Sequence, residues 1–190
     1  MTVGREHGAR TVRVAADEAE RALLWKGRKS AFGAIARIAP DYYLHDAVVP
    51  RTRLVDVLEQ VYDIAAEQRL TMMNVFHAGD GNLHPLVLYD ANAPGELAKA
   101  EAFGAEILRL CVEVGGVLTG EHGVGVEKRD LMEVQFTAVD LEQQQRLKCA
   151  FDPEQLFNPG KVFPTLCRCA ELGRVHVRGG ATRFPELPRF

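Results

Sequence analysis

The chain has 190 residues, of which 47% are hydrophobic and 26% are charged, and its net charge at pH 7 is −3. This length and composition suit one globular domain or a domain with an appendage. The slightly acidic balance argues against a basic surface for nucleic acid, and no apolar run approaches the ~20 residues of a membrane span. Residues 1–10 lack the apolar segment of a secretory signal, so we expect a cytoplasmic protein.

The hydrophobic pattern predicts alternating strands and helices along the chain. Strands are expected at residues 11–15, 42–49, 70–77, 84–89 and 117–119. Helices are expected from Asp17 with a bend or break near Gly27 or Gly33, from Thr52, from Pro94 to the pair Gly115-Gly116, and over 126–136 and 138–150. Asp17 with Glu20, and Thr137 with Asp140, show the spacing of helix-capping residues.

The order of elements between residues 42 and 119 is strand, helix, strand, strand, helix, strand. This order is typical of the ferredoxin-like fold. We therefore predict an α+β protein with a ferredoxin-like antiparallel sheet, helices on one face of that sheet, and a C-terminal helical segment. The other face of such a sheet is free to cover a site or a partner.

A histidine-rich hairpin is the first candidate site. Asp80-Gly81 is a strong signal for a two-residue turn, because both residues tolerate positive φ. Such a turn would place His77 directly opposite His84, with Cβ atoms roughly 5 Å apart. Two converging imidazoles suit a divalent metal ion, although they supply only two of the ligands it needs.

Glu121, in a glycine-rich turn after the last predicted strand, is the candidate for the third ligand. Two histidines and one carboxylate with open positions form a catalytic pattern for zinc and non-haem iron. Neighbours in an extended segment point apart, so His122 would be free to act as a base. Taken alone, Glu121 could equally be a solvated carboxylate. The glycines around it match neither common nucleotide-binding spacing.

Three motifs then indicate a family. HAGDGNLHP (residues 77–85), GEHGVGVEK (120–128) and FDPEQLFNPGKVFP (151–164) occur in a fixed order, and WKGRKSAF (25–32) and PDYY (40–43) precede them. Together they resemble the C-terminal domain of the FAD-linked oxidases of the vanillyl-alcohol oxidase superfamily, in particular its glycolate oxidase branch. The resemblance extends over nearly all of the chain from about residue 11.

The resemblance implies an oxidoreductase that acts on D-2-hydroxy acids with FAD. It implies a divalent metal, commonly zinc, at His77, His84 and Glu121. It also implies that His122 takes the proton of the substrate hydroxyl and that Arg28 binds the substrate carboxylate. A bidentate arginine and a metal-bound hydroxyl are chemically suited to these roles.

The resemblance also implies that this chain binds the substrate and that another domain or subunit binds most of the FAD. Asn158 and Lys161 would lie beside the flavin. Residues 1–122 would form a cap that binds substrate, and residues 123–190 a helical segment and tail that pack toward an FAD domain. That FAD-binding domain or subunit is missing here and would act in trans, beside an iron–sulfur subunit that accepts electrons. Partner subunits would hold the cytoplasmic complex at the inner face of the membrane.

Two departures from the family pattern concern the substrate. Leu86 stands where relatives that use dicarboxylates have a polar residue, and Leu44 stands where they have a lysine. Both changes favour a small 2-hydroxy acid. Two other hypotheses stay open at this point, namely a stand-alone metal-binding module or metal-dependent hydrolase, and an inactive truncated remnant.

Overall fold

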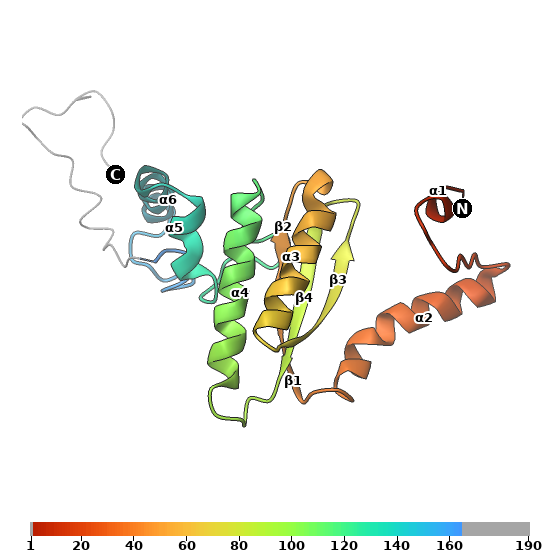
Figure 1. Cartoon of the computed structure of the whole chain (residues 1–190). Coiled ribbons are helices and arrows are strands. Elements are labelled where there is room, and N and C mark those ends of the chain that lie inside the picture. Colours follow the sequence, from red (N-terminus) through yellow and green to blue (C-terminus); the bar gives the residue numbers. More distant parts are fainter. Residues whose placement is uncertain (1, 165–190) are drawn as a thin grey trace, which may run out of the picture. The chain divides into compact units, whose positions relative to one another are not determined.

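The structure, a computed structural model, describes residues 2–164, and its larger unit is built on an antiparallel sheet covered on one face by two helices (Figure 1). The predicted α+β class with helices on one face of a small sheet is confirmed. The chain divides into two compact units, residues 1–41 and the remainder from Tyr42. None of the described helices is long and apolar enough to cross a membrane. The predicted tail, residues 165–190, lies outside the described part.

Strand β4 (Asn82–Tyr89) lies at the middle of the sheet. It pairs with β3 (Thr71–His77) on one side, and with β1 (Asp41–Leu44) and β2 (Ala47–Val48) on the other. Predicted strand 42–49 is therefore present as two pieces, with His45 and Asp46 between them.

The last of the predicted strands, residues 117–119, is reduced to a single bridge between Val48 and Val117. The amide of Leu118 donates to the side chain of Gln135 at 2.8 Å, and the amides of Gly120, Glu121 and His122 donate to the carboxylate of Asp46 at 2.9 Å. Backbone amides that donate to side chains in this way do not build a strand ladder. The segment therefore turns away from the sheet after one residue.

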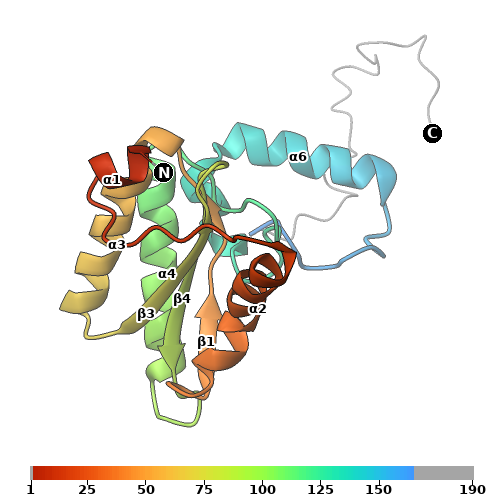
Figure 2. The same ribbon diagram turned by 90° about the vertical axis from the view of Figure 1, so that its right-hand side faces the viewer.

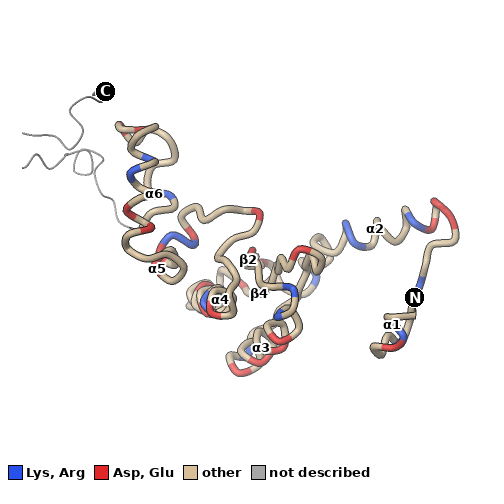
Figure 3. The backbone as a smooth tube through the Cα atoms, turned by 90° about the horizontal axis from the view of Figure 1, so that it is seen from above, with Lys and Arg blue, Asp and Glu red and all other residues tan. Residues whose placement is uncertain are grey.

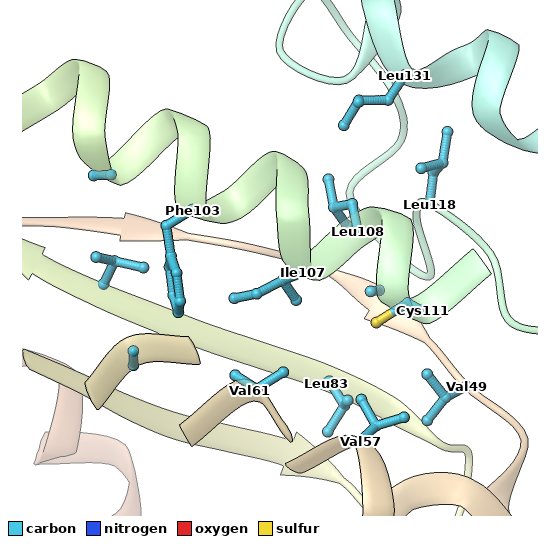
Figure 4. Close-up of a cluster of buried hydrophobic side chains, with 14 of the residues drawn as sticks. Val49, Val57, Val61, Leu83, Phe103, Ile107, Leu108, Cys111, Leu118 and Leu131 are labelled. Carbon is cyan, nitrogen blue, oxygen red and sulfur yellow. The ribbon is translucent and has the colours of Figure 1, made fainter. Parts of the chain in front are cut away.

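Helices α3 (Leu54–Glu67) and α4 (Glu96–Glu113) cover one face of the sheet, as Figures 1 and 2 show. Their buried side chains recur every three or four residues, which is the spacing of one helix face. Figure 4 shows this core, in which these two helices meet the sheet and the loops beyond it: Val49, Val57, Val61, Leu83, Phe103, Ile107, Leu108, Cys111, Leu118 and Leu131. Burying a large apolar side chain contributes roughly 1.5–3 kcal/mol, so this face holds most of the unit's stability.

The outer faces of these helices are charged. Along α4, one lysine and one arginine are interspersed among four glutamates rather than gathering in one patch (Figure 3). The prediction that Thr52 caps helix α3 is wrong. A short 3₁₀ turn, η1 (Arg51–Arg53), comes first, and no side chain caps the helix after it.

The C-terminal helical segment is present with one difference from prediction. Helix α6 (Ala138–Phe151) begins with the predicted capping box of Thr137 and Asp140. Of the helix predicted at 126–136, only the turn η2 (Arg129–Leu131) and the short α5 (Met132–Gln135) form.

In the N-terminal unit, α1 is Thr2–Glu6 and α2 is Glu18–Ile35. The predicted cap is confirmed, because Asp17 accepts the amide of Glu20. The strand predicted at 11–15 does not form, since a β-branched run needs a partner for its backbone groups. The break predicted in α2 is also wrong. A glycine costs a helix only about 1 kcal/mol, and α2 continues through Gly27 and Gly33.

Candidate metal centre

The histidine hairpin differs from the prediction by a shift of register. His77 lies opposite Asn82, and Val75 lies opposite His84. The loop is four residues, 78–81, because Gly81 also serves the neighbouring strand: its carbonyl accepts the amide of Val49 at 2.9 Å. A shift of two residues keeps every side chain on its face of the sheet. The two imidazoles still converge, as diagonal neighbours with ring centroids 5.6 Å apart.

Glu121 completes a group of three potential ligands. One ligand atom from each of His77, His84 and Glu121 lies within 4.8 Å of the others. The carboxylate oxygens are 3.6 Å from Nε2 of His77 and 3.9 Å from Nε2 of His84. Two imidazoles and a carboxylate are the donor set of a three-ligand catalytic zinc site, so these residues fit a divalent cation. His77 and Glu121 are exposed, whereas His84 is buried, which leaves one side of the group open.

Asn82 orients the carboxylate of this group. Its side-chain amide donates to Oε1 of Glu121 at 2.9 Å. Asn82 is buried on the same face as His77, its cross-strand partner. One amide therefore links the hairpin to the loop that carries the third ligand.

The loop that carries Glu121 is built around the buried carboxylate of Asp46. Its Oδ2 accepts the hydroxyl of Thr119 at 2.7 Å. The same oxygen accepts three consecutive backbone amides at 2.9 Å, those of Gly120, Glu121 and His122. Burial would raise the pKa of Asp46, but these hydrogen bonds outweigh it and hold the pKa well below its usual range.

The His84 ring is oriented by two oxygen atoms that lie near its Nδ1. Its Nδ1 lies 3.3 Å from the carbonyl oxygen of His45 and 3.9 Å from Oδ1 of Asp46. Both of those atoms are of the acceptor type, and the His45 carbonyl is within hydrogen-bond distance. The ring is thereby fixed with Nε2 toward Glu121.

A buried lysine fixes the backbone at Asp46. The ammonium group of Lys128 donates to the Asp46 carbonyl at 2.6 Å and lies 3.7 Å from Oδ2 of the same residue. Burial lowers the pKa of Lys128, and the nearby Asp46 carboxylate offsets part of that change. A buried charge needs such a partner.

His122 lies beside the ligand group rather than on the opposite side. Its ring stacks on that of His84, with centroids 5.3 Å apart and an interplanar angle of 17°. The expectation that neighbours point apart applies to a strand, and residues 120–123 form a loop instead. His122 is exposed, so its ring is open to substrate.

The other predicted residues lie on separate elements. Arg28 belongs to α2 in the N-terminal unit. Lys161 donates to the side chain of Asn158 at 3.2 Å in a turn near the end of the described chain, where Asn158 has a φ of 48°. The substrate role of Arg28 and the flavin roles of Asn158 and Lys161 stay predictions.

Sequence reasoning missed four supporting residues: Asp46, Asn82, Thr119 and Lys128. Asn82 and Lys128 lie inside the motifs that were singled out. Asp46 had a usable signal, since it is the one acidic residue in the predicted strand 42–49, whose other residues are mostly apolar. A charge in such a place is rarely buried without a partner.

Comparison with known proteins identifies the family of the chain. The family model for the C-terminal domain of FAD linked oxidases matches residues 3–162, so the chain belongs to that family. It is 55% identical to the glycolate oxidase subunit GlcD of Escherichia coli K12 over 183 residues, which are 96% of this chain and 37% of the relative.

Two more distant relatives extend the comparison. GlcD of Bacillus subtilis is 39% identical over 153 residues, 80% of this chain and 33% of that protein. A probable mitochondrial D-lactate dehydrogenase of Danio rerio is 33% identical over 163 residues, 85% of this chain and 33% of that protein. The chain thus spans only about a third of the length of these relatives.

Proposed function

We propose that the chain is the substrate- and metal-binding part of an FAD-dependent D-2-hydroxy-acid oxidoreductase of the glycolate oxidase type. The observation that carries this proposal is the convergence of His77, His84 and Glu121 beside the open ring of His122. Membership of the FAD-linked oxidase family and the similarity to two GlcD subunits and a D-lactate dehydrogenase support it.

His77, His84 and Glu121 would hold a divalent cation, and zinc suits this donor set. When bound, the cation would polarise the substrate hydroxyl and lower its pKa, and FAD would accept the hydride from Cα. His122 would take the hydroxyl proton on its imidazole, a general-base role that suits a histidine near neutral pH. Arg28 would bind the substrate carboxylate through its guanidinium.

A small substrate, such as glycolate or D-lactate, fits the residues at hand. Leu86 is fully buried on the same strand face as His84 and offers no hydrogen bond to a second carboxylate. Leu44, at the end of β1, offers none either. A substrate with a second charged end would have to leave that charge unpaired, which is costly.

The full reaction needs partners. We propose an FAD-binding domain or subunit against which Asn158 and Lys161 lie, and an iron–sulfur subunit as the electron acceptor. The GlcD relatives are named as subunits of glycolate oxidase, which supports an assembly of this kind. A cytoplasmic complex, held at the inner face of the membrane by its partners, is consistent with the proposal.

The experiment distinguishes a metal ligand, His77, from the proposed base, His122. In the purified chain, His77→Ala should lose stoichiometric zinc, whereas His122→Ala should keep it, as measured by elemental analysis and native mass spectrometry. Equal loss in both variants would contradict the separate roles. Reconstitution with an FAD-binding partner should then give a yellow protein that glycolate reduces. Metal-dependent hydrolysis without flavin would favour a hydrolase instead.

A further inference from the structure

We propose that Asp46 is the positioning residue of this site, which holds the Glu121–His122 loop and the His84 ring in the arrangement that binds metal. The inference deepens the proposed function and rests on it. Asp46 lies between β1 and β2 and is fully buried. It is not itself in the three-ligand group.

The first step concerns the loop. Three consecutive amides, those of Gly120, Glu121 and His122, point at one carboxylate oxygen. Successive amides that turn toward one point form a concave anion-binding nest, and here the anion is a side chain of the protein. The position of the Glu121 carboxylate therefore depends on the charge at Asp46. A neutral amide in its place would offer a weaker acceptor and place a donor beside these N–H groups.

Close packing supports this reading of the loop. A Cβ at Gly120 would lie 2.7 Å from Cγ2 of Val48, 3.0 Å from Nδ2 of Asn82 and 3.0 Å from Oδ1 of Asp46. Only glycine lets the loop lie this close to the strand face. The loop thus has no room to move toward the sheet, and Asp46 keeps it from moving away.

The second step concerns the His84 tautomer. Nδ1 of His84 faces two acceptors, the carbonyl of His45 and Oδ1 of Asp46. Acceptors on that side favour a proton on Nδ1, which leaves the lone pair of Nε2 directed toward Glu121. Metal-ligating histidines are oriented in this way by carboxylates or carbonyls behind the ring. Oδ1 of Asp46 is buried with no hydrogen-bond partner of its own among the described residues, so its charge acts on this ring and on the loop.

The experiment uses Asp46→Asn and a matched control, Asp152→Asn. Asp152 is also buried, accepts the amides of Leu156 and Phe157 at 2.8 and 3.0 Å, and is paired with Lys148. It differs from Asp46 in belonging to the C-terminal turn rather than to the metal centre. Three quantities are measured on the 190-residue chain: cobalt and zinc affinity, the cobalt absorption spectrum, and amide hydrogen exchange at residues 120–122.

Asp46→Asn should weaken metal binding by about tenfold to a hundredfold, the usual effect of losing a residue behind the ligands. It should also change the cobalt spectrum and remove the exchange protection of the three amides. Asp152→Asn should leave all three measurements unchanged. Wild-type affinity and protection in Asp46→Asn would overturn the inference, as would an equal loss in both variants.

A milder variant covers the case in which Asp46→Asn does not fold. Thr119→Val keeps the shape of the side chain, but it removes one of the four donors to Oδ2 and the acceptor of the Gly123 amide. It should weaken metal binding by about fivefold or more, because the loss of one hydrogen bond already has an effect of about this size. Unchanged metal affinity and unchanged exchange protection in this variant would count against the inference.

Failure of the proposed function would look different. If the wild-type chain binds no metal, the metal proposal fails. The positioning role of Asp46 is then tested by measurements on the metal-free protein. There, loss of protection at residues 120–122 and a changed ¹⁵N shift of the His84 ring in Asp46→Asn would support its positioning role. Retention of both would overturn it.

Discussion

One face of strand β4 belongs to the hydrophobic core, and the other face contributes to the candidate metal centre. Leu83 and Val87 face α3 and α4 and belong to the hydrophobic core. Asn82 and His84, on either side of Leu83, face the loop that carries Glu121. Because side chains alternate along a strand, one short segment supplies both the stability of the fold and the geometry of the site.

The two residues between β1 and β2, His45 and Asp46, show the same division. The ring of His45 lies against α4, where a Cβ on Gly104 would come within 1.9 Å of it. Asp46 turns to the other face and holds the loop of residues 119–122. Changes on the helix face should therefore affect unfolding, and changes on the loop face should affect metal binding.

Leu83→Ala should produce the largest loss of stability. Leu83 is fully buried, and truncating a buried leucine costs about 2–5 kcal/mol through lost transfer energy and the cavity left behind. Urea unfolding of the metal-free chain measures this loss. The fraction that stays folded should bind metal as the wild type does. A loss of metal affinity with no change in unfolding would contradict the division of faces.

His45 should make the helix face sensitive to acid. Burial, with a smaller effect of Lys128, lowers the pKa of His45 from its ordinary 6.5 to about 4. The unfolded chain then binds a proton that the folded chain does not, so stability is complete above pH 6.5 and falls as the pH drops toward 4. The loss reaches roughly 3 kcal/mol.

His45→Gln supplies the comparison for this effect. Its free energy of unfolding, measured by urea at several pH values in the presence of a chelator, should change less between pH 7 and pH 4.5 than that of the wild type. A packing defect alone would lower stability equally at both pH values. Identical pH slopes in the two proteins would therefore contradict the assignment to His45.

His77→Ala should have the smallest effect on stability. The side chain is 43% exposed, and substitutions of exposed residues usually change the free energy of unfolding by less than about 0.5 kcal/mol. The same variant is expected to lose metal. If the free energy of unfolding of the metal-free variant were more than about 1 kcal/mol below that of the wild type, the loop face would also contribute to stability, against this prediction.

Much of the fold follows from local patterns. The apolar spacing of α3 and α4, the capping box of α6 and the two hairpin strands were predictable, because each depends on residues close together in the sequence. The strand at 11–15 and the break in α2 were wrong for the opposite reason. A strand needs a distant partner, and a glycine does not by itself end a helix.

The site divides in the same way. The sequence by itself identified the family and the three potential ligands, since His77, His84 and Glu121 lie in short motifs. Only the tertiary structure decided the register that makes the two histidines diagonal, the stacking of His122 on His84, and the role of Asp46. These features depend on hydrogen bonds and packing between residues about 30 to 80 positions apart, and spacing along the chain does not reveal such contacts.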